Sequence, residues 1–360
     1  MEKNIKILVV RFKQIGDSVL ASPICNTLKK TYPDSEVDYV VYEHIAPLFE
    51  NHHAIDNVIA ITKEEQKNPL KYIAKVWKVT RKKYDIIIDI MSTPKSEVFT
   101  LFGRSAEYRI GRHKKKRGYT YTHKIHEPVG AKDKVDKFLR MLDPLTDAGI
   151  DVKYDHEYNI DVSSEERCRI RERMTGAGVD LNKPIVAFSI NSRRPEKIWN
   201  IEYMKKLIEK VLKEKGAQGI FYYSPAEKEF ALNLHKEMGE RRDIFTNIVT
   251  KDIRELAALI SQCDMFIGNE GGPRHIAQGV DTPSVAIFSP SAEKKEWLSN
   301  ANERHRGIEY LDVLSNDEID GIMKEEESRS KLYDSIGVDD VYNLVEEVWK
   351  KADYDKKYSV

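Results

Sequence analysis

The sequence is poor in cysteine and has no long apolar run. Its three cysteines, Cys25, Cys168 and Cys263, lie far apart and form no Cys-x-x-Cys pair. This spacing argues against a disulfide framework or a zinc site and fits a reducing cytoplasm. No apolar run approaches the roughly 20 residues of a membrane-spanning helix, and Ile7–Val10 is too short for a signal peptide. We therefore expect a cytoplasmic protein with no bound metal.

An overall charge of either sign is also missing. Lys and Arg number 59, as do Asp and Glu, so the formal net charge is zero and gives no case for nucleic acid binding. The charge is uneven locally, with eleven basic and three acidic residues in Arg109–Arg140, and one basic and eight acidic residues in Glu309–Glu327. Such runs usually lie on solvated faces. The apolar fraction of 41% is enough for packed cores.

Apolar strands alternate with amphipathic helices in two series. The runs Ile5–Val10 and Ile86–Ile90 indicate strands that are covered on both faces. Arg109–Gly130, rich in Lys, Tyr, His and Gly, then reads as a long loop, with a hairpin as one alternative. The alternation resumes at Ile185–Ile190 and predicts α/β domains with parallel sheets.

The length of 360 residues and the two series predict two domains joined by a linker near Gly149–Ser163. Two such sheets imply a cleft between them, with ligands outside the carboxyl ends of the strands, where helix amino termini attract anions. The expected parts are residues 1–160, residues 161–335, and a C-terminal helix within 336–360 that is able to pack back on the first domain.

The loop Arg11–Asp17 contains one glycine, whereas a dinucleotide-binding turn needs the pattern G-x-G-x-x-G. The same pattern is missing from the second half, which argues against a nicotinamide or flavin enzyme. The loop instead presents Asp17 at the start of a helix, as a candidate general base. An N-cap role explains Asp17 from spacing alone as well.

Two loops of the second half have the chemistry of an anion site. Ser189–Trp199 offers hydroxyls, an amide and three cations, which suit a phosphate. Asn269–His275 places two glycines before Pro273, a residue suited to the first helical position, so that N–H groups can approach a diphosphate or a sugar. Glu270 would accept from sugar or ribose hydroxyls. The alternatives are a solvated loop with Trp199 in the core, and a simple turn with a satisfied His275.

Two weaker candidates follow other strands of the second half. Glu227 could accept from a ribose hydroxyl, although an exposed helix acid explains it as well. Lys251 lies where we expect a backbone edge to meet a nucleotide base.

Three segments together resemble glycosyltransferase family 9, the lipopolysaccharide heptosyltransferases: Ile7–Pro23, Ile253–Ile260 and Phe266–Pro290. The resemblance covers most of the chain. It implies the GT-B architecture, in which two Rossmann-like domains face each other across a cleft. It also implies an ADP-heptose donor in the carboxyl half, a lipopolysaccharide inner-core acceptor in the amino half, and inversion at the anomeric carbon without a metal or cofactor.

The resemblance also implies roles for single residues. Asp17 matches the family's general base, and Lys197 matches the lysine near the donor phosphates. Glu270 stands where some members have Asp, and Arg193 replaces a hydroxyl residue of some members. The remaining donor-binding matches are Ser192 and Arg193 in the hydroxyl-bearing loop, and Gly271, Gly272 and His275 at the helix start.

The basic stretch of the amino half then has an expected partner. An inner-core acceptor carries carboxylates and often phosphates, and it lies on an anionic membrane face. Basic residues near such a surface would support peripheral docking at the cytoplasmic face of the inner membrane. A disordered solubilising loop is the alternative. The expected acceptor-binding residues are Lys13, Arg112, Lys114, Lys115, Lys116 and Arg117.

We therefore expect an inverting, metal-independent heptosyltransferase with Asp17 as its base. Three alternatives stay open: the same chemistry with another nucleotide sugar, an NAD(P) oxidoreductase, and a non-catalytic nucleotide-sugar-binding protein.

Overall fold

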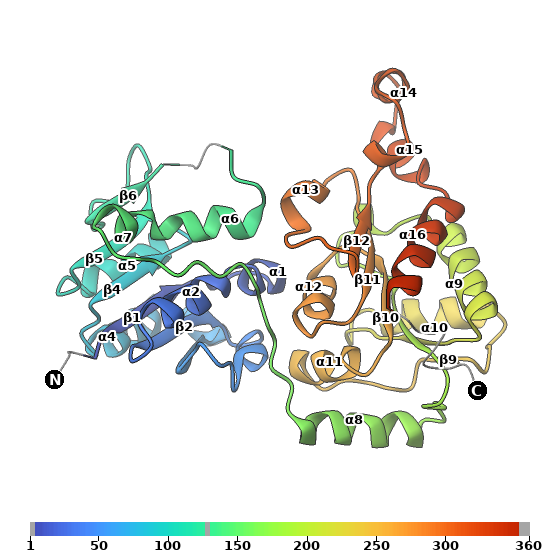
Figure 1. The fold of residues 1–360 in the computed structure, drawn as a ribbon, viewed down its shortest axis with the longest axis horizontal. Coiled ribbons are helices and arrows are strands. Elements are labelled where there is room, and N and C mark those ends of the chain that lie inside the picture. Colours follow the sequence, from blue (N-terminus) through green and yellow to red (C-terminus); the bar gives the residue numbers. More distant parts are fainter. Residues whose placement is uncertain (1–3, 127–129, 353–360) are drawn as a thin grey trace. The chain divides into compact units, whose positions relative to one another are not determined.

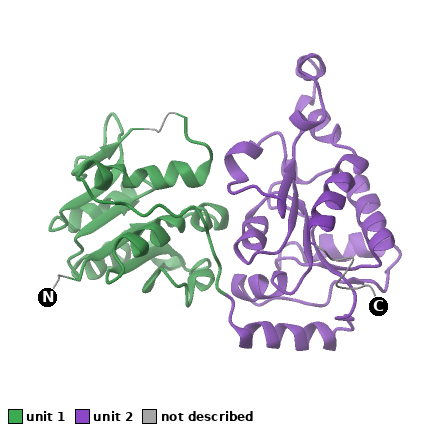
Figure 2. Cartoon of the chain, viewed as in Figure 1, with its two compact units in different colours: residues 1–161 green, residues 162–360 purple. Residues whose placement is uncertain are grey.

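The computed structural model describes residues 4–126 and 130–352 (Figure 1). The chain forms two compact units, Met1–Asp161 and Val162–Val360 (Figure 2). The boundary falls one residue after the position expected from the sequence. Residues 151–163, which lead from one unit into the other, contain no helix or strand.

Unit 1 is built on a six-stranded parallel sheet with the order β3-β2-β1-β4-β5-β6. The central strands β1 and β4 are the continuous apolar runs of the sequence, and helices cover them on both faces, so their side chains are buried. The strands are β1 (Lys6–Val10), β2 (Glu36–Tyr42), β3 (Asn57–Ile61), β4 (Ile86–Asp89), β5 (Tyr108–Arg112) and β6 (His123–Ile125).

The helices of unit 1 pack on this sheet through apolar stripes. Tyr72 and Val76 of α4 and Phe99 of α5 join one cluster with the strand residues Leu8 and Ile87. The helices are α1 (Ile15–Val19), α2 (Pro23–Thr31), η1 (Ala46–Phe49), α3 (Lys63–Lys67), α4 (Pro69–Thr80), α5 (Pro94–Phe102), α6 (Lys134–Leu139), η2 (Arg140–Leu142) and α7 (Asp143–Asp147).

The stretch 109–130 is not the long loop expected from its composition. It contains most of β5 and all of β6, which pair in parallel, so the two strands do not form a hairpin. The ring of Tyr121 lies over Gly111, where an added Cβ would come within 2.3 Å of that ring. Pairing with β4 and this packing, rather than an apolar run, make the segment a strand. Residues 127–129 of the stretch lie outside the described residues.

Unit 2 has a second six-stranded parallel sheet, with the order β12-β11-β10-β7-β8-β9. Its shortest strand, Ile244–Phe245, lies at one edge, where the backbone pairs with β8. The strands are β7 (Ile185–Ser189), β8 (Gln218–Phe221), β9 (Ile244–Phe245), β10 (Met265–Asn269), β11 (Ser284–Ile287) and β12 (His305–Ile308).

The last helix, α16 (Val338–Lys351), belongs to the core of unit 2. It packs against α9 and β11, and its buried residues Val341, Val345 and Trp349 join the apolar cluster of that sheet. The expectation that this helix packs back on the first domain is therefore wrong for its apolar face. The other helices are α8 (Ser164–Gly176), η3 (Pro195–Lys197), α9 (Ile201–Lys215), α10 (Lys228–Glu237), α11 (Ile253–Ile260), α12 (Gly272–Gly279), α13 (Lys294–Trp297), η4 (Tyr310–Asp312), α14 (Asn316–Ile322) and α15 (Ser328–Asp334).

Among the described helices, none combines the length and the apolar character that crossing a lipid bilayer requires.

Candidate active site

Each unit has one point where the order of its strands reverses. In unit 1 the chain moves from β1 outward to β3 and then returns to β4 on the other side of β1. In unit 2 it moves from β7 outward to β9 and returns to β10 on the other side of β7. A crevice opens outside the carboxyl ends of the strands at such a point, and ligands of open α/β sheets bind there. All three motif loops of the sequence follow these central strands.

In unit 1, Asp17 is held by a buried ion pair. The Nη2 atom of Arg11, the first residue after β1, lies 2.5 Å from Asp17 Oδ1, and both side chains are almost fully buried. The exposed Lys13 places its Nζ atom 3.9 Å from Asp17 Oδ2. Gln14 occupies the N-cap of α1, and Asp17 is the third helical residue. The N-cap interpretation of Asp17 is therefore wrong, and its carboxylate is fixed by basic side chains at the sheet edge.

A second arginine approaches the same aromatic ring as Arg11. The Cζ atoms of Arg11 and Arg112 lie 4.7 Å and 6.0 Å from the centre of the Phe138 ring. Arg112 ends β5, so the two guanidinium groups come from strands on either side of β4. The two guanidinium groups place positive charge at this edge, which suits an anionic ligand.

A fully buried carboxylate organises the loop after β4. Asp89 Oδ1 accepts the backbone N–H groups of Met91 and Ser92, and Asp89 Oδ2 accepts the hydroxyl of Tyr121 at 2.7 Å. Burial raises the pKa of Asp89 to about 6, against the opposing effect of these hydrogen bonds. Ser92 Oγ in turn accepts the N–H of Arg112. Asp89 thus sets the backbone that carries Arg112.

The other basic residues of this region lie on the surface. An antiparallel bridge between Lys114 and Arg117 closes a tight turn, and Lys114, Lys115, Lys116 and Arg117 are all exposed. The structure therefore groups Asp17, Lys13 and Arg112 around the ends of the central strands, while the four-residue basic turn extends from the end of β5.

In unit 2, an ion pair joins the two candidate loops. Lys197 Nζ contacts Glu270 Oε1, so the loop after β7 is linked to the loop after β10 across the switch point. The Glu270 side chain is nearly buried and that of Lys197 is partly buried. A second link is the N–H of Trp199, which donates to Asn269 Oδ1 at 2.9 Å. Trp199 itself is fully buried, as one reading of this loop had it.

The start of α12 is open to an anion. Gly271 is the N-cap, Gly272 and Pro273 begin the helix, and no described side chain caps this end. The positive end of the helix dipole and the unbonded N–H groups of the first turn favour negative charge there. Upstream, Gly268 has φ of +135°, and an added Cβ would lie 2.4 Å from the carbonyl oxygen of Ser189. The close approach of β10 to β7 therefore requires glycine at this position.

His275 and Arg274 lie inside unit 2, beneath this helix start. Arg274 donates to His275 Nδ1 (2.7 Å), to Gln278 Oε1 (2.6 Å) and to the Trp297 carbonyl (2.6 Å). Burial, followed by the charges of Arg274 and Lys197, holds the pKa of His275 well below its usual range. Arg274 therefore holds α12 against the segment around Trp297.

The remaining donor-site candidates differ in position. Ser192 Oγ accepts the N–H of Arg194 within the loop after β7, and Arg193 is exposed in the same loop. Glu227 is the N-cap residue of α10, and its carboxylate accepts the N–H and the hydroxyl of Ser224. Lys251 is exposed, and its Nζ atom lies 3.7 Å from Glu255 Oε1, in the segment between β9 and α11. Ser192 and Arg193 thus share the loop after β7 with Lys197, whereas Glu227 and Lys251 follow β8 and β9.

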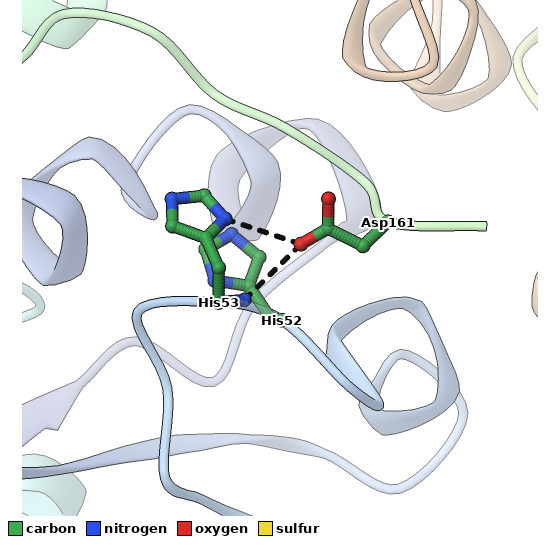
Figure 3. Close-up of side chains that lie close together, drawn as sticks. All are labelled: His52, His53 and Asp161. Atoms are coloured by element: carbon green, nitrogen blue, oxygen red, sulfur yellow. Dashed lines mark hydrogen bonds and ion pairs between the residues drawn. The ribbon is translucent and has the colours of Figure 1, made fainter. Parts of the chain in front are cut away.

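A separate cluster in unit 1 groups His52, His53 and Asp161 (Figure 3). Asp161 Oδ2 lies 3.1 Å from both the backbone N and the Nδ1 atom of His53. The two imidazole rings stack at 4.7 Å with only 17° between their planes. Because the Asp161 carboxylate is held by two contacts to His53, we assign the cluster a structural role. It ties the segment that leaves unit 1 to the loop after η1.

The sequence did not single out several of these residues. Arg11 and Asn269 stood inside the quoted motifs without a role, and Asp89 was read only as part of a strand. Their place in the sequence could have indicated them, since each of these residues ends or directly follows a buried strand, at the carboxyl edge of its sheet.

Two Rossmann-like units, each with its candidate loops at a switch point, are the features of the GT-B fold. Solved structures share this fold. A family 9 glycosyltransferase from Veillonella parvula superposes with a TM-score of 0.79, at 22% identity, covering 98% of this chain and 99% of that one. The Escherichia coli heptosyltransferase WaaC, solved with ADP-2-deoxy-2-fluoro heptose, gives 0.69 at 17% identity, covering 95% and 99%.

The sequence narrows the class to one family. Residues 73–310 match glycosyltransferase family 9 (heptosyltransferase), and the chain belongs to that family. It is similar to lipopolysaccharide heptosyltransferase 3 of Escherichia coli K12, with 25% identity over 339 residues, which are 84% of this chain and 93% of the relative. Lipopolysaccharide heptosyltransferase 1 of Campylobacter coli is 22% identical over 83% of this chain and 88% of its own length. The protein is a glycosyltransferase, and its relatives act in lipopolysaccharide biosynthesis.

Proposed function

We propose that the protein transfers a heptose from ADP-heptose to a lipopolysaccharide inner-core acceptor, with inversion at the anomeric carbon and without a metal ion. The observation that carries this proposal is the position of the motif residues. Asp17 follows the switch-point strand of unit 1, and the linked Lys197 and Glu270 follow the two switch-point strands of unit 2.

The donor half of the reaction needs a stabilised leaving group. An ADP-sugar releases a diphosphate, whose developing charge requires fixed positive groups. Lys197 and the N–H groups at the start of α12 supply them, so that neither a metal nor a protonated carboxyl is needed. Glu270 holds the Lys197 ammonium in place and offers its second oxygen to a hydroxyl of the sugar or ribose.

The acceptor half needs a base. Asp17 takes the proton of the attacking sugar hydroxyl as the new bond forms, and the ion pair with Arg11 keeps the carboxylate in one orientation. Lys13, Arg112 and the exposed turn of Lys114, Lys115, Lys116 and Arg117 would bind the carboxylates and phosphates of the inner core. Since that acceptor is anchored in a membrane, the enzyme would act at the cytoplasmic face of the inner membrane.

The first test is Asp17→Asn, assayed for ADP release with ADP-heptose and truncated core acceptors. Loss of a general base lowers kcat by about 10²- to 10⁴-fold, while the Kd for ADP-heptose stays near that of the unmodified enzyme. Asp56→Asn is the matched control, because it removes an ion pair to Lys29 from the opposite edge of the same sheet. Unchanged turnover in Asp17→Asn would remove Asp17 from the base role.

The second test separates the donor role from general stability. Lys197→Ala should weaken ADP-heptose binding and lower kcat, whereas Lys210→Ala, which removes a surface ion pair to Asp339 in the same unit, should do neither. Transfer in excess EDTA should equal transfer without it. Preference for another nucleotide sugar in the same assay would favour the alternative donor over ADP-heptose.

A further inference from the structure

The segment from Lys67 to Tyr84 in unit 1 has seven Lys and Arg residues and no Asp or Glu. Most of it forms α4, the helix between β3 and β4. This is a local excess of positive charge that is separate from the basic turn after β5. It stands in a chain whose net charge is zero.

The outer face of α4 is apolar, although it faces solvent. Tyr72, Val76 and Thr80 point into unit 1 and are buried. Leu70, Ile73 and Trp77 point outward, with exposed fractions of 79%, 43% and 51%. Residues three and four apart lie on one face of a helix, so these three form a single stripe. We call this stripe the α4 outer face.

Basic side chains flank the α4 outer face. The guanidinium of Arg81 lies over the Trp77 ring at 4.7 Å, and Lys67, Lys71 and Lys78 are exposed. Part of the charge of the segment is balanced by carboxylates outside it: Lys71 and Lys75 pair with Glu64 and Glu65 of α3, and Lys82 pairs with Glu36 and Asp38 of β2. Single exposed apolar residues are ordinary on protein surfaces. An aligned Leu, Ile and Trp between lysines is the pattern of a helix that lies in a membrane interface.

We propose that the α4 outer face is a membrane-docking surface that takes an anionic phospholipid bilayer. Trp77 and Leu70 would enter the headgroup boundary, and the flanking lysines would meet the lipid phosphates. The charge favours an anionic lipid surface, because the exposed Lys67 and Lys78 and the Arg81 guanidinium beside Trp77 complement headgroup phosphates. This docking surface depends on the proposed function only for the identity of the membrane-anchored acceptor.

The position of α4 suits an enzyme that works on a membrane-anchored substrate. In a parallel sheet, the helix after a strand begins at the strand's carboxyl end. The first turn of α4, with Leu70, therefore lies toward the edge of unit 1 that carries Asp17. An acceptor held at the bilayer surface would project toward that edge.

The test is binding of the purified full-length protein to vesicles, with no donor or acceptor present. We expect co-sedimentation with vesicles of phosphatidylglycerol and phosphatidylcholine in equal parts, and much less with phosphatidylcholine alone. Trp77→Gln should weaken binding by about tenfold or more, since burying an aromatic side chain is a large apolar gain. Lys67→Gln with Lys78→Gln should also weaken it by more than about tenfold, as each basic residue near the surface contributes about fivefold.

Matched variants distinguish binding through this surface from nonspecific adsorption to vesicles. Leu311→Gln removes an apolar side chain of unit 2 that is exposed to 54%, and it should leave binding unchanged. Trp77→Phe should keep most of the binding but abolish the blue shift of tryptophan fluorescence that vesicles produce. Transfer to a soluble truncated acceptor should be unaffected in Trp77→Gln.

Three results would overturn the proposal. The first is no vesicle binding by the unmodified protein. The second is vesicle binding by Trp77→Gln that equals binding by the unmodified protein. This outcome includes the case in which only substitutions in the turn 114–117 reduce vesicle binding. The third is a Trp77 blue shift that depends on protein concentration without lipid, which would assign the face to a second copy of the chain. None of these results depends on whether heptose is the transferred sugar.

Discussion

Gly268 lies near the end of β10, and replacing it with alanine should damage unit 2 more than its surface area suggests. The new Cβ would lie 2.4 Å from the Ser189 carbonyl oxygen, and the backbone φ of +135° is one that residues with a side chain rarely adopt. The backbone strain costs about 1–3 kcal/mol, and overpacking against a rigid neighbour costs about 1–3 kcal/mol more. Gly268→Ala should therefore lower the free energy of unfolding by about 2–6 kcal/mol.

The matched control is the same substitution at Gly176. This residue ends the helix α8, and an added Cβ there meets no atom within 4 Å. Gly176→Ala should stabilise unit 2 by up to about 0.5 kcal/mol, because alanine is a better helix former. Urea denaturation followed by circular dichroism measures both variants. Equal midpoints for Gly268→Ala and Gly176→Ala would refute the close approach of β10 to β7.

The same substitution also tests the donor site. Asn269 and Glu270 follow Gly268 directly, so a displaced strand end would separate Glu270 from Lys197. We expect Gly268→Ala to weaken ADP binding in calorimetry at a temperature where the variant is still folded. Normal ADP affinity in the folded variant would show that the contact between Lys197 and Glu270 is unnecessary for binding.

Two further predictions concern unit 1. Arg11→Met leaves the Asp17 carboxylate buried without its guanidinium partner, and it should lower the free energy of unfolding, measured by urea denaturation, by about 3 kcal/mol. Adding Asp17→Asn to this variant should restore part of that free energy. An unchanged free energy of unfolding in Arg11→Met would contradict the buried ion pair. Burial, then the charge of His53, lowers the pKa of His52 from 6.5 to about 4. The folded protein thus binds a proton at His52 more weakly than the unfolded chain does. The free energy of unfolding is therefore unaffected by His52 above pH 6.5, and it falls by about 3 kcal/mol in total as the pH decreases from 6.5 toward 4. His52→Asn should flatten the pH dependence of stability over this range, and an unchanged slope would contradict the assignment.

The central part of the fold was predictable because its signal is local. Strands such as β1, β4 and β7 are unbroken apolar runs, and a run that is covered on both faces needs no knowledge of its neighbours to be recognised. The motif loops were predictable for a related reason, since loops after central parallel strands meet at one edge. This reasoning led to Asp17, Lys197 and Glu270 before their surroundings were known.

The edges of the sheets were not predictable in the same way. The residues of β6 (His123–Ile125) and β12 (His305–Ile308) are polar or mixed, and they are strands because a neighbouring strand pairs with them. The direction of a long side chain is likewise a tertiary property. Arg274 stands in the first turn of α12, at a helix start suited to a diphosphate, yet its side chain turns inward to Gln278 and Trp297. No spacing rule distinguishes these two outcomes.

The place of α16 has a consequence for how the chain matures during translation. Unit 1 has all of its residues once position 161 has left the ribosome, so it can fold while the rest is being made. The core of unit 2 stays open until Val341, Val345 and Trp349 emerge, because these side chains fill the space beside α9 and β11. A nascent chain arrested before position 338 would carry a finished first half and a second half that exposes apolar surface to chaperones and proteases.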